Sequence, residues 1–219
     1  MPNPSTAGAP TARFLALEGV DGSGKSTQAQ LLADWYRAHG MDVMLTREPG
    51  GTALGERLRA IVLDPAITCA DRAELMLMLA ARAQHVAACI RPALAAGQVV
   101  ITDRFSLSSL AYQGYGRGLP LEEIRAADAV ATGGLRPDLT LVIDVPLETA
   151  LERLGAARDR IEGEGAAFLR RVIAGYHALA HSDATIRLVD GRPAAAAIHR
   201  AITAGLSCPA PANPAEGEP

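Results

Sequence analysis

The sequence predicts an α/β fold: a three-layer sandwich in which a five-stranded parallel sheet carries helices on both faces. Short apolar runs that suit buried strands alternate along the chain with longer segments of helical periodicity. Strands that alternate with helices form parallel sheets through right-handed crossovers, which cover both faces of the sheet. The chain has 219 residues, of which 49% are hydrophobic, so it is long enough to bury one sizeable core.

Five runs rich in apolar and β-branched residues predict the strands. They are Phe14–Leu17, Asp42–Thr46, Gln98–Thr102, Asp138–Ile143 and Thr185–Val189. Helices are predicted at Gln28–His39, Ala53–Leu63, Asp71–Ala96, Ser106–Tyr112, Glu122–Val130, Leu147–Leu154, Ala166–Ala180 and Ala194–Ala204. Asp71 can cap the long third helix, Pro92 predicts a kink within it, and Pro120 suits a helix start. Breaks rich in glycine are expected at Arg47–Thr52, Gln113–Leu119 and Gly155–Gly165.

One folded domain is expected between residues 13 and 206. Residues 1–12 and 207–219 are rich in Pro, Ala, Gly and Asn and have little apolar surface to bury, which predicts disordered tails.

Charge and composition argue against several classes of partner. The formal net charge is −3, so a general surface for polyanions is not expected and nucleic acid is not a predicted partner. The longest uncharged apolar run, Leu75–Ala81, is too short to span a bilayer, and no secretory signal is visible. Cys69, Cys89 and Cys208 are odd in number and widely spaced, as reduced thiols often are. A cytoplasmic protein without membrane attachment is therefore expected.

A glycine-rich turn directly follows the first predicted strand and fits the phosphate-binding pattern Gly-x4-Gly-Lys-Ser. It consists of Gly19, Val20, Asp21, Gly22, Ser23, Gly24, Lys25, Ser26 and Thr27. Glycines let backbone N–H groups turn inward around a polyphosphate, Lys25 reaches the β- and γ-phosphates, and the Ser26 hydroxyl can hold Mg²⁺. Lys25 is the only lysine among 21 basic residues, which suits a tight loop where a compact ammonium fits and a wide guanidinium does not. The turn predicts a nucleotide site on a P-loop NTPase fold.

Asp103 and Asp144 each directly follow a predicted strand. An acid in this place beside a phosphate loop can hold Mg²⁺, usually through water. Asp103 is favoured because Arg104 follows it, which suits a site that handles a metal and a phosphate together. For Asp144, metal binding and capping of the next helix are equally compatible with the sequence.

Several arginines lie where they could bind an anion. Arg47 ends the second strand in a Pro/Gly loop, where it could grip phosphate or simply pair with Glu48 in solvent. Arg82 falls on an apolar stripe of the long helix and therefore needs a partner, either a bound base or acid or a carboxylate from elsewhere in the domain. A segment between two helices adds Arg153, Arg158 and Arg160, which could close over ATP or form a solvated loop. His177 and His181, four residues apart, are assigned no role.

In order along the chain, several pieces together resemble bacterial thymidylate kinase over nearly the whole predicted domain. They are residues 19–27, Thr46–Thr52 (Thr-Arg-Glu-Pro-Gly-Gly-Thr), Ala80–Arg82, Asp103–Phe105, Ser109–Gly114, Arg136–Thr140 and Asp159–Glu162. The resemblance implies a nucleoside monophosphate kinase fold with a short LID flap near residues 153–165. It also implies transfer of the γ-phosphoryl group of MgATP to dTMP, giving dTDP for dTTP biosynthesis, and a homodimer.

The same resemblance implies roles for individual residues. Asp21 would hold the sugar 3′-hydroxyl, Arg47 and Arg104 the acceptor phosphate, and Arg82 the thymine. Ser109, Tyr112 and Gln113 would line the base and sugar, with Tyr112 crowding out a ribose 2′-hydroxyl. Met78 stands where relatives commonly stack an aromatic ring on the base; a thioether can still pack there. The loop has no arginine between Gly19 and Gly24, so Arg153, Arg158 and Arg160 inherit the catalytic arginine role as a group.

Two other functions use similar loops. A regulatory GTPase reads guanine with an Asn-Lys-x-Asp motif, which needs a second lysine that this chain lacks. A kinase acting on another nucleoside monophosphate, or on a deoxynucleoside, is the remaining enzymatic alternative.

Overall fold

The computed structural model of the chain describes residues 13–154 and 160–207. Both predicted tails, apart from Ser207, lie outside these residues, as does Arg158 in the predicted flap.

Five parallel strands form a single sheet in the order β2-β3-β1-β4-β5, which confirms the predicted fold class. The strands are β1 (Phe14–Glu18), β2 (Val43–Arg47), β3 (Val99–Asp103), β4 (Leu139–Asp144) and β5 (Ile186–Asp190). Central β1 pairs with β3 and β4, so that Leu17 lies opposite both Asp103 and Leu141. The carboxyl ends of the strands therefore meet at one edge, where open α/β sheets bind their ligands.

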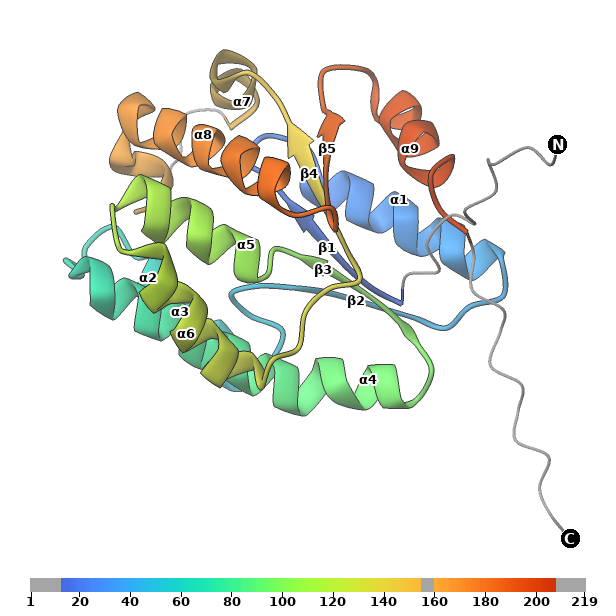
Figure 1. The fold of residues 1–219 in the computed structure, drawn as a ribbon, viewed down its shortest axis with the longest axis horizontal. Helices are drawn as coiled ribbons and strands as arrows, with labels where there is room; N and C mark the ends of the chain where they lie inside the picture. Colours follow the sequence, from blue (N-terminus) through green and yellow to red (C-terminus); the bar gives the residue numbers. More distant parts are fainter. Residues whose placement is uncertain (1–12, 155–159, 208–219) are drawn as a thin grey trace, which may run out of the picture.

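Helices cover both faces of this sheet (Figure 1). They are α1 (Lys25–Ala38), α2 (Ala53–Leu63), α3 (Asp71–His85), α4 (Arg91–Ala95), α5 (Ser106–Ser109), α6 (Leu121–Thr132), α7 (Leu147–Leu154), α8 (Ala166–Ser182) and α9 (Ala195–Thr203), with a 3₁₀ turn η3 (Glu162–Glu164). Figure 1 shows α1 and α9 on one side of the sheet and α4, α5 and α8 on the other. Alternate residues of β1 supply the two cores: Leu15 and Leu17 pack in the first, Phe14 and Ala16 in the second.

Two π-helical segments depart from the predicted boundaries. The long helix passes through η1 (Val86–Ile90) before α4, whose first turn contains Pro92. The predicted glycine-rich loop at 113–119 is wrong for its first four residues, because η2 (Leu110–Gly116) continues α5 through them. The reason is packing: a Cβ on Gly114 would lie 2.4 Å from Leu121 Cδ2, and one on Gly116 would lie 2.6 Å from the Phe168 ring. These glycines permit close helix contacts and do not form a turn.

By length and composition alone, the continuous helical run Asp71–Ala95 could cross a membrane. It also carries Glu74, Arg82 and His85, all buried and all bonded to polar side chains of the domain. Such paired charges, together with its packing against α2 and α6, mark it as a core helix of the domain.

Candidate active site at the carboxyl ends of the strands

The phosphate loop between β1 and α1 contains glycines at positions where the backbone conformation and the close neighbours leave no room for a side chain. Gly19 has φ +130°, and a Cβ there would lie 2.6 Å from the carbonyl oxygen of Ile143. Gly22 has φ +78°, and a Cβ there would lie 2.4 Å from the carbonyl oxygen of Ala150. The loop ends at Gly24 in the left-handed conformation, and α1 begins at Lys25. The N–H groups of the first turn of α1 are thus available to an anion.

Lys25 and Ser26 occupy the positions that the loop pattern predicts. Lys25 is buried, and its Nζ donates to the carbonyl oxygen of Val20 at 3.1 Å and to Asp21 Oδ1 at 3.2 Å. Burial lowers the pKa of Lys25, and the nearby charge of Arg104 lowers it further. The ammonium is thus held in the loop, where it can bind phosphate oxygens.

Ser26 and Asp103, the two residues predicted to hold Mg²⁺, lie in contact. Ser26 Oγ donates to Asp103 Oδ2 at 2.5 Å, because β3 lies beside β1 and ends next to the loop. A hydroxyl and a carboxylate oxygen are hard ligands that suit Mg²⁺, which typically takes one or two carboxylates and completes its shell with water and phosphate oxygens. In residues 13–154 and 160–207, no three His, Cys, Asp or Glu side chains gather as metal ligands.

Arg104 joins the phosphate loop to the adjacent pocket. Its Nη1 donates to the carbonyl oxygen of Gly19 at 3.0 Å and to Ser108 Oγ at 3.1 Å. Its Nη2 donates to Asp21 Oδ1 at 2.6 Å and to Tyr112 OH at 3.2 Å. The backbone of Arg104 has φ +74°, a strained conformation for a side chain of this size and one that gathers at functional sites.

Charge pairing sets the ionisation of these groups. Burial alone would raise the pKa of Asp21, but the charges of Arg104 and Lys25 outweigh it and hold that pKa below its usual range. Burial raises the pKa of the Tyr112 phenol, so Tyr112 is neutral at physiological pH. Asp21 therefore pairs as a carboxylate with both cations of the loop edge, Lys25 and Arg104.

Arg82 is buried on α3 with only 3% of its side chain exposed. Its Nε donates to Glu48 at 2.7 Å and its Nη2 to the carbonyl oxygen of Phe105 at 3.0 Å, while its Nη1 donates to Ser109 at 3.0 Å and Asp128 at 2.6 Å. Of the two kinds of partner that the sequence left open, the structure shows the carboxylates, and Arg82 also lines a pocket in which a ligand could reach it. These bonds use four of its five N–H groups among the described residues, leaving one for a ligand.

That pocket lies beside the phosphate loop and brings together most of the predicted acceptor residues. It is lined by Asp21, Met78, Arg82, Arg104, Ser109, Tyr112 and Gln113, and also by Glu48, Pro49, Arg59, Leu63, Ser108 and Ile161. Apolar walls with a few converging polar groups are typical of small-molecule sites. Arg104 and Asp21 belong to the pocket and to the loop edge at once, so the two halves of the site are continuous.

Arg47 is the one predicted acceptor residue outside the pocket lining. Its side chain is 57% exposed and pairs with both oxygens of Glu56. The suggested pairing with Glu48 is wrong, because Glu48 turns inward to Arg82. Arg59, which the sequence analysis did not single out, lines the pocket instead and donates to the carbonyl oxygen of Pro49 at 3.0 Å.

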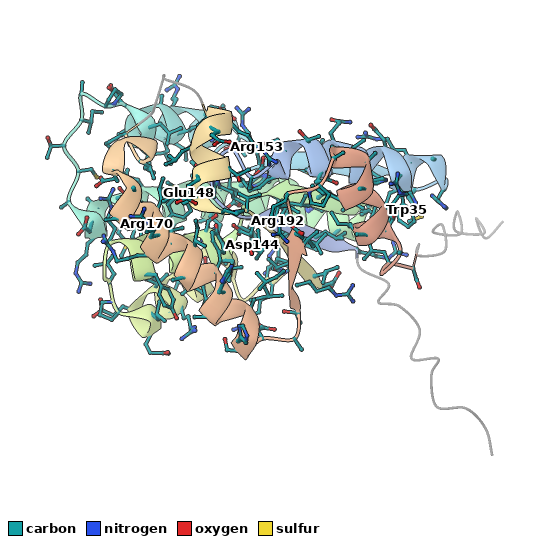
Figure 2. The ribbon with its side chains drawn as sticks, turned by 90° about the horizontal axis from the view of Figure 1, so that it is seen from above. Trp35, Asp144, Glu148, Arg153, Arg170 and Arg192 are labelled. Atoms are coloured by element: carbon teal, nitrogen blue, oxygen red, sulfur yellow. The ribbon has the colours of Figure 1, made fainter. Side chains whose placement is uncertain are left out.

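The two described flap arginines take different directions. Arg153 of α7 donates to the carbonyl oxygens of Gly22, Ser23 and Gly191 at 3.3–3.4 Å, and Figure 2 shows it near the start of α1, with Trp35 toward the opposite end. Arg160 instead donates to Glu74 at 2.6 Å and to the carbonyl oxygen of Val62 at 2.7 Å. Arg153 therefore lies by the phosphate loop and Arg160 behind the pocket.

Asp144, the second aspartate considered for metal binding, lies 2.9 Å from His177 Nε2, and its charge interacts with that of Arg192 (Figure 2).

Sequence reasoning missed a set of buried carboxylates that support the site. They are Glu18, Glu48 and Glu74, together with the partly buried Asp128. One signal was available: Glu74, Met78 and Arg82 are spaced four residues apart, which places them along one face of α3. Their partners come from distant parts of the chain and leave no local pattern.

The loop, its lysine and the acid ending the neighbouring strand define a P-loop nucleotide-binding protein, and the arginine-lined pocket beside them suits a second, anionic substrate. The family model for thymidylate kinase matches residues 17–202. A thymidylate kinase of Desulfovibrio desulfuricans is 53% identical over 180 residues, covering 78% of this chain and 83% of that protein. One of Pseudomonas putida is 49% identical over 197 residues, covering 88% and 94%.

A solved structure agrees with these relatives. Thymidylate kinase from Ehrlichia chaffeensis matches with a TM-score of 0.73 and 32% identity, covering 89% of this chain and 98% of the other. The chain belongs to the thymidylate kinase family, whose members phosphorylate dTMP to dTDP with ATP. The predicted family, fold and class of enzyme are thereby confirmed.

Proposed function

We propose that this enzyme transfers the γ-phosphoryl group of ATP to the 5′-phosphate of dTMP within the site described above, and so supplies dTDP for dTTP biosynthesis. The observation that carries the proposal is Arg104, which bonds the phosphate loop through Gly19 and lines the acceptor pocket through Asp21 and Tyr112. A buried guanidinium in this position can hold the acceptor phosphate against the donor phosphate.

The reaction needs no covalent enzyme intermediate. An oxygen of the dTMP phosphate attacks the γ-phosphorus, the bond from that phosphorus to the β–γ bridging oxygen breaks, and ADP leaves with the bridging oxygen. Lys25 and the loop N–H groups hold the triphosphate, and Arg104 neutralises the acceptor. Ser26 and Asp103 would hold Mg²⁺, which when bound supplies positive charge to the β- and γ-phosphate oxygens.

The catalytic arginine is proposed from the group Arg153, Arg158 and Arg160. Arg153 has the strongest support, since its guanidinium lies beside the loop carbonyls and its hydrogen bonds there are long. Arg47 would contribute to the acceptor phosphate by leaving Glu56, with which it pairs in solvent.

The acceptor base is proposed to lie between Met78 and the polar groups of Arg82, Ser109 and Gln113. The remaining N–H of Arg82 suits the 4-keto oxygen of thymine. Asp21 would take the sugar 3′-hydroxyl, and Tyr112, buried against Arg104 and Phe168, leaves little room for a 2′-hydroxyl.

The test is a panel of acceptors presented with MgATP: dTMP, dUMP, UMP, AMP and thymidine. ADP release should be fastest with dTMP by a wide margin. A preference for a purine monophosphate or for thymidine itself would defeat the proposal.

We further propose that the enzyme works as a cytoplasmic homodimer without nucleic acid or membrane partners. Support comes from large apolar side chains that stay exposed on adjacent helices: Leu54 and Ile61 on α2, Met76 on α3 and Val130 on α6. Light scattering on the purified enzyme should give twice the 22.8 kDa chain mass, and a monomer at micromolar concentration would contradict the dimer.

A further inference from the structure

Glu74 is a buried carboxylate behind the acceptor pocket that the mechanism above does not use. It is 1% exposed and accepts hydrogen bonds from three other side chains. Gln113 Nε2 donates to its Oε1 at 2.8 Å and Arg117 Nε donates to the same oxygen at 3.3 Å, while Arg117 Nη2 and Arg160 Nη2 donate to its Oε2 at 2.9 and 2.6 Å. Glu74 thus joins α3 to η2, to the turn after η2, and to the end of the flap.

The carboxylate is ionised at neutral pH. Burial opposes ionisation, but hydrogen bonds from Arg117, Gln113 and Arg160 outweigh it, so the pKa of Glu74 falls below its usual range. An ionised carboxylate only accepts hydrogen bonds, so Gln113 must present its NH₂ group to it. Glu74 therefore fixes which way the amide of Gln113 points.

This orientation decides what the pocket presents to a base. Gln113 lines the pocket but Glu74 does not, so the NH₂ end of the amide points out of the pocket and the oxygen end is left to face it. Among the hydrogen bonds of the described residues, none is to the Gln113 amide oxygen, and this oxygen is not one of their fully buried unpaired atoms, so it is accessible from the pocket. The pocket wall therefore offers a fixed acceptor at this point.

We propose that Glu74 is a positioning residue for base selection: by locking the Gln113 amide, it makes the pocket accept pyrimidines that carry N–H at ring position 3 and reject cytosine. The inference rests on the proposed function. Thymine and uracil have a donor at N3, whereas the N3 of cytosine is an acceptor and would face the Gln113 oxygen without a hydrogen bond. A site built around a fixed polar partner discriminates strongly against a ligand that cannot complete it.

The substitution Glu74→Gln tests this directly because Arg117 and Arg160 can only donate. Two short hydrogen bonds, from Arg117 Nη2 and Arg160 Nη2, hold the Oε2 position, whereas Arg117 Nε lies 3.3 Å from Oε1. The new amide oxygen will therefore stay at the Oε2 position, and the new NH₂ group will face Gln113 and turn that amide around. The ratio of kcat/KM for dTMP over dCMP should fall about tenfold or more. The KM for dTMP and the KM for dUMP should both rise, whereas kcat and the KM for ATP should change little. A general loss of structure would not produce this pattern.

Asp71→Asn is the matched control. Asp71 is also on α3 and lies 3.5 Å from Arg117, but it is half-exposed and does not contact Gln113. It should leave the dTMP/dCMP ratio unchanged. The double variant Glu74→Gln/Gln113→Glu should restore the ratio, since the new NH₂ group at position 74 donates to one carboxylate oxygen at position 113 and leaves the other facing the pocket.

An unchanged ratio in folded Glu74→Gln, or an equal fall in Asp71→Asn, would overturn the inference while leaving dTMP kinase activity intact. A wild-type enzyme that does not phosphorylate dTMP would instead defeat the proposed function. If Glu74→Gln does not fold, a crystal structure of the wild type with dTMP decides. Gln113 should lie within about 3.2 Å of thymine N3, and contact with the keto oxygens alone would overturn the inference.

Discussion

Replacing Arg82 by lysine probes the acceptor site without removing its charge. Arg82 forms four hydrogen bonds with the domain, to Glu48, Ser109, Asp128 and the Phe105 carbonyl, and keeps one N–H for the base. A lysine ammonium has three donors at one point and cannot span these partners. The lysine ammonium will remain beside Glu48 and Asp128, so the proposed hydrogen bond to the base is lost.

Loss of a hydrogen bond from a charged donor costs about 1.5–3 kcal/mol. The KM for dTMP should therefore rise about tenfold to a hundredfold. The KM for ATP should change little, because Arg82 does not touch the phosphate loop. Steady-state kinetics with each substrate varied in turn measures both values.

The control for this substitution is Arg125→Lys, an exposed arginine on α6 paired with Glu122. It should leave both KM values unchanged. Equal rises in the KM values for dTMP and ATP in Arg82→Lys would refute the reasoning, since Arg82 would then act only through the stability of the domain.

Three further substitutions test other parts of the site. Asp103→Asn should raise the Mg²⁺ concentration for half-maximal activity about tenfold, whereas Asp144→Asn, at the other strand end, should not; equal shifts would contradict the metal assignment. Gly22→Ala should abolish ATP binding in calorimetry, while Gly40→Ala, at the same φ of +78° but with open space around it, should bind ATP normally. Glu74→Gln should lower the free energy of unfolding by about 2 kcal/mol at neutral pH. Because the folded-state pKa of Glu74 lies below its ordinary 4.5, its contribution is complete above that pH and is lost as the pH falls through the lowered value. Melting temperatures of wild type and variant should thus converge toward acid pH, and a constant gap would argue against an ionised Glu74.

Local sequence patterns were sufficient to predict the sheet and the phosphate loop. The glycines of the loop, its single lysine and the strand before it lie within fourteen residues, and all five strands could be predicted from short apolar runs. Arg82 could be singled out because a charge on an apolar stripe must find a partner.

Features set by contacts between distant segments could not be predicted. The glycines of 113–119 suggest a loop, yet Gly114 and Gly116 lie in a π-helix because Leu121 and Phe168 approach too closely for a side chain. Glu74 and Gln113 are 39 residues apart, and only the fold shows that one orients the other. Arg59 lines the pocket and Arg47 does not, because Glu56 pairs with Arg47 and holds it outside. The sequence alone does not show this pairing.

Direct transfer of the phosphoryl group from ATP to dTMP is tested most simply with ATP labelled by ³²P at the γ position. Incubation with dTMP and Mg²⁺ should place the label in dTDP, in amounts equal to the ADP formed. Label that appears only as inorganic phosphate, or that remains on the protein after denaturation, would contradict direct transfer.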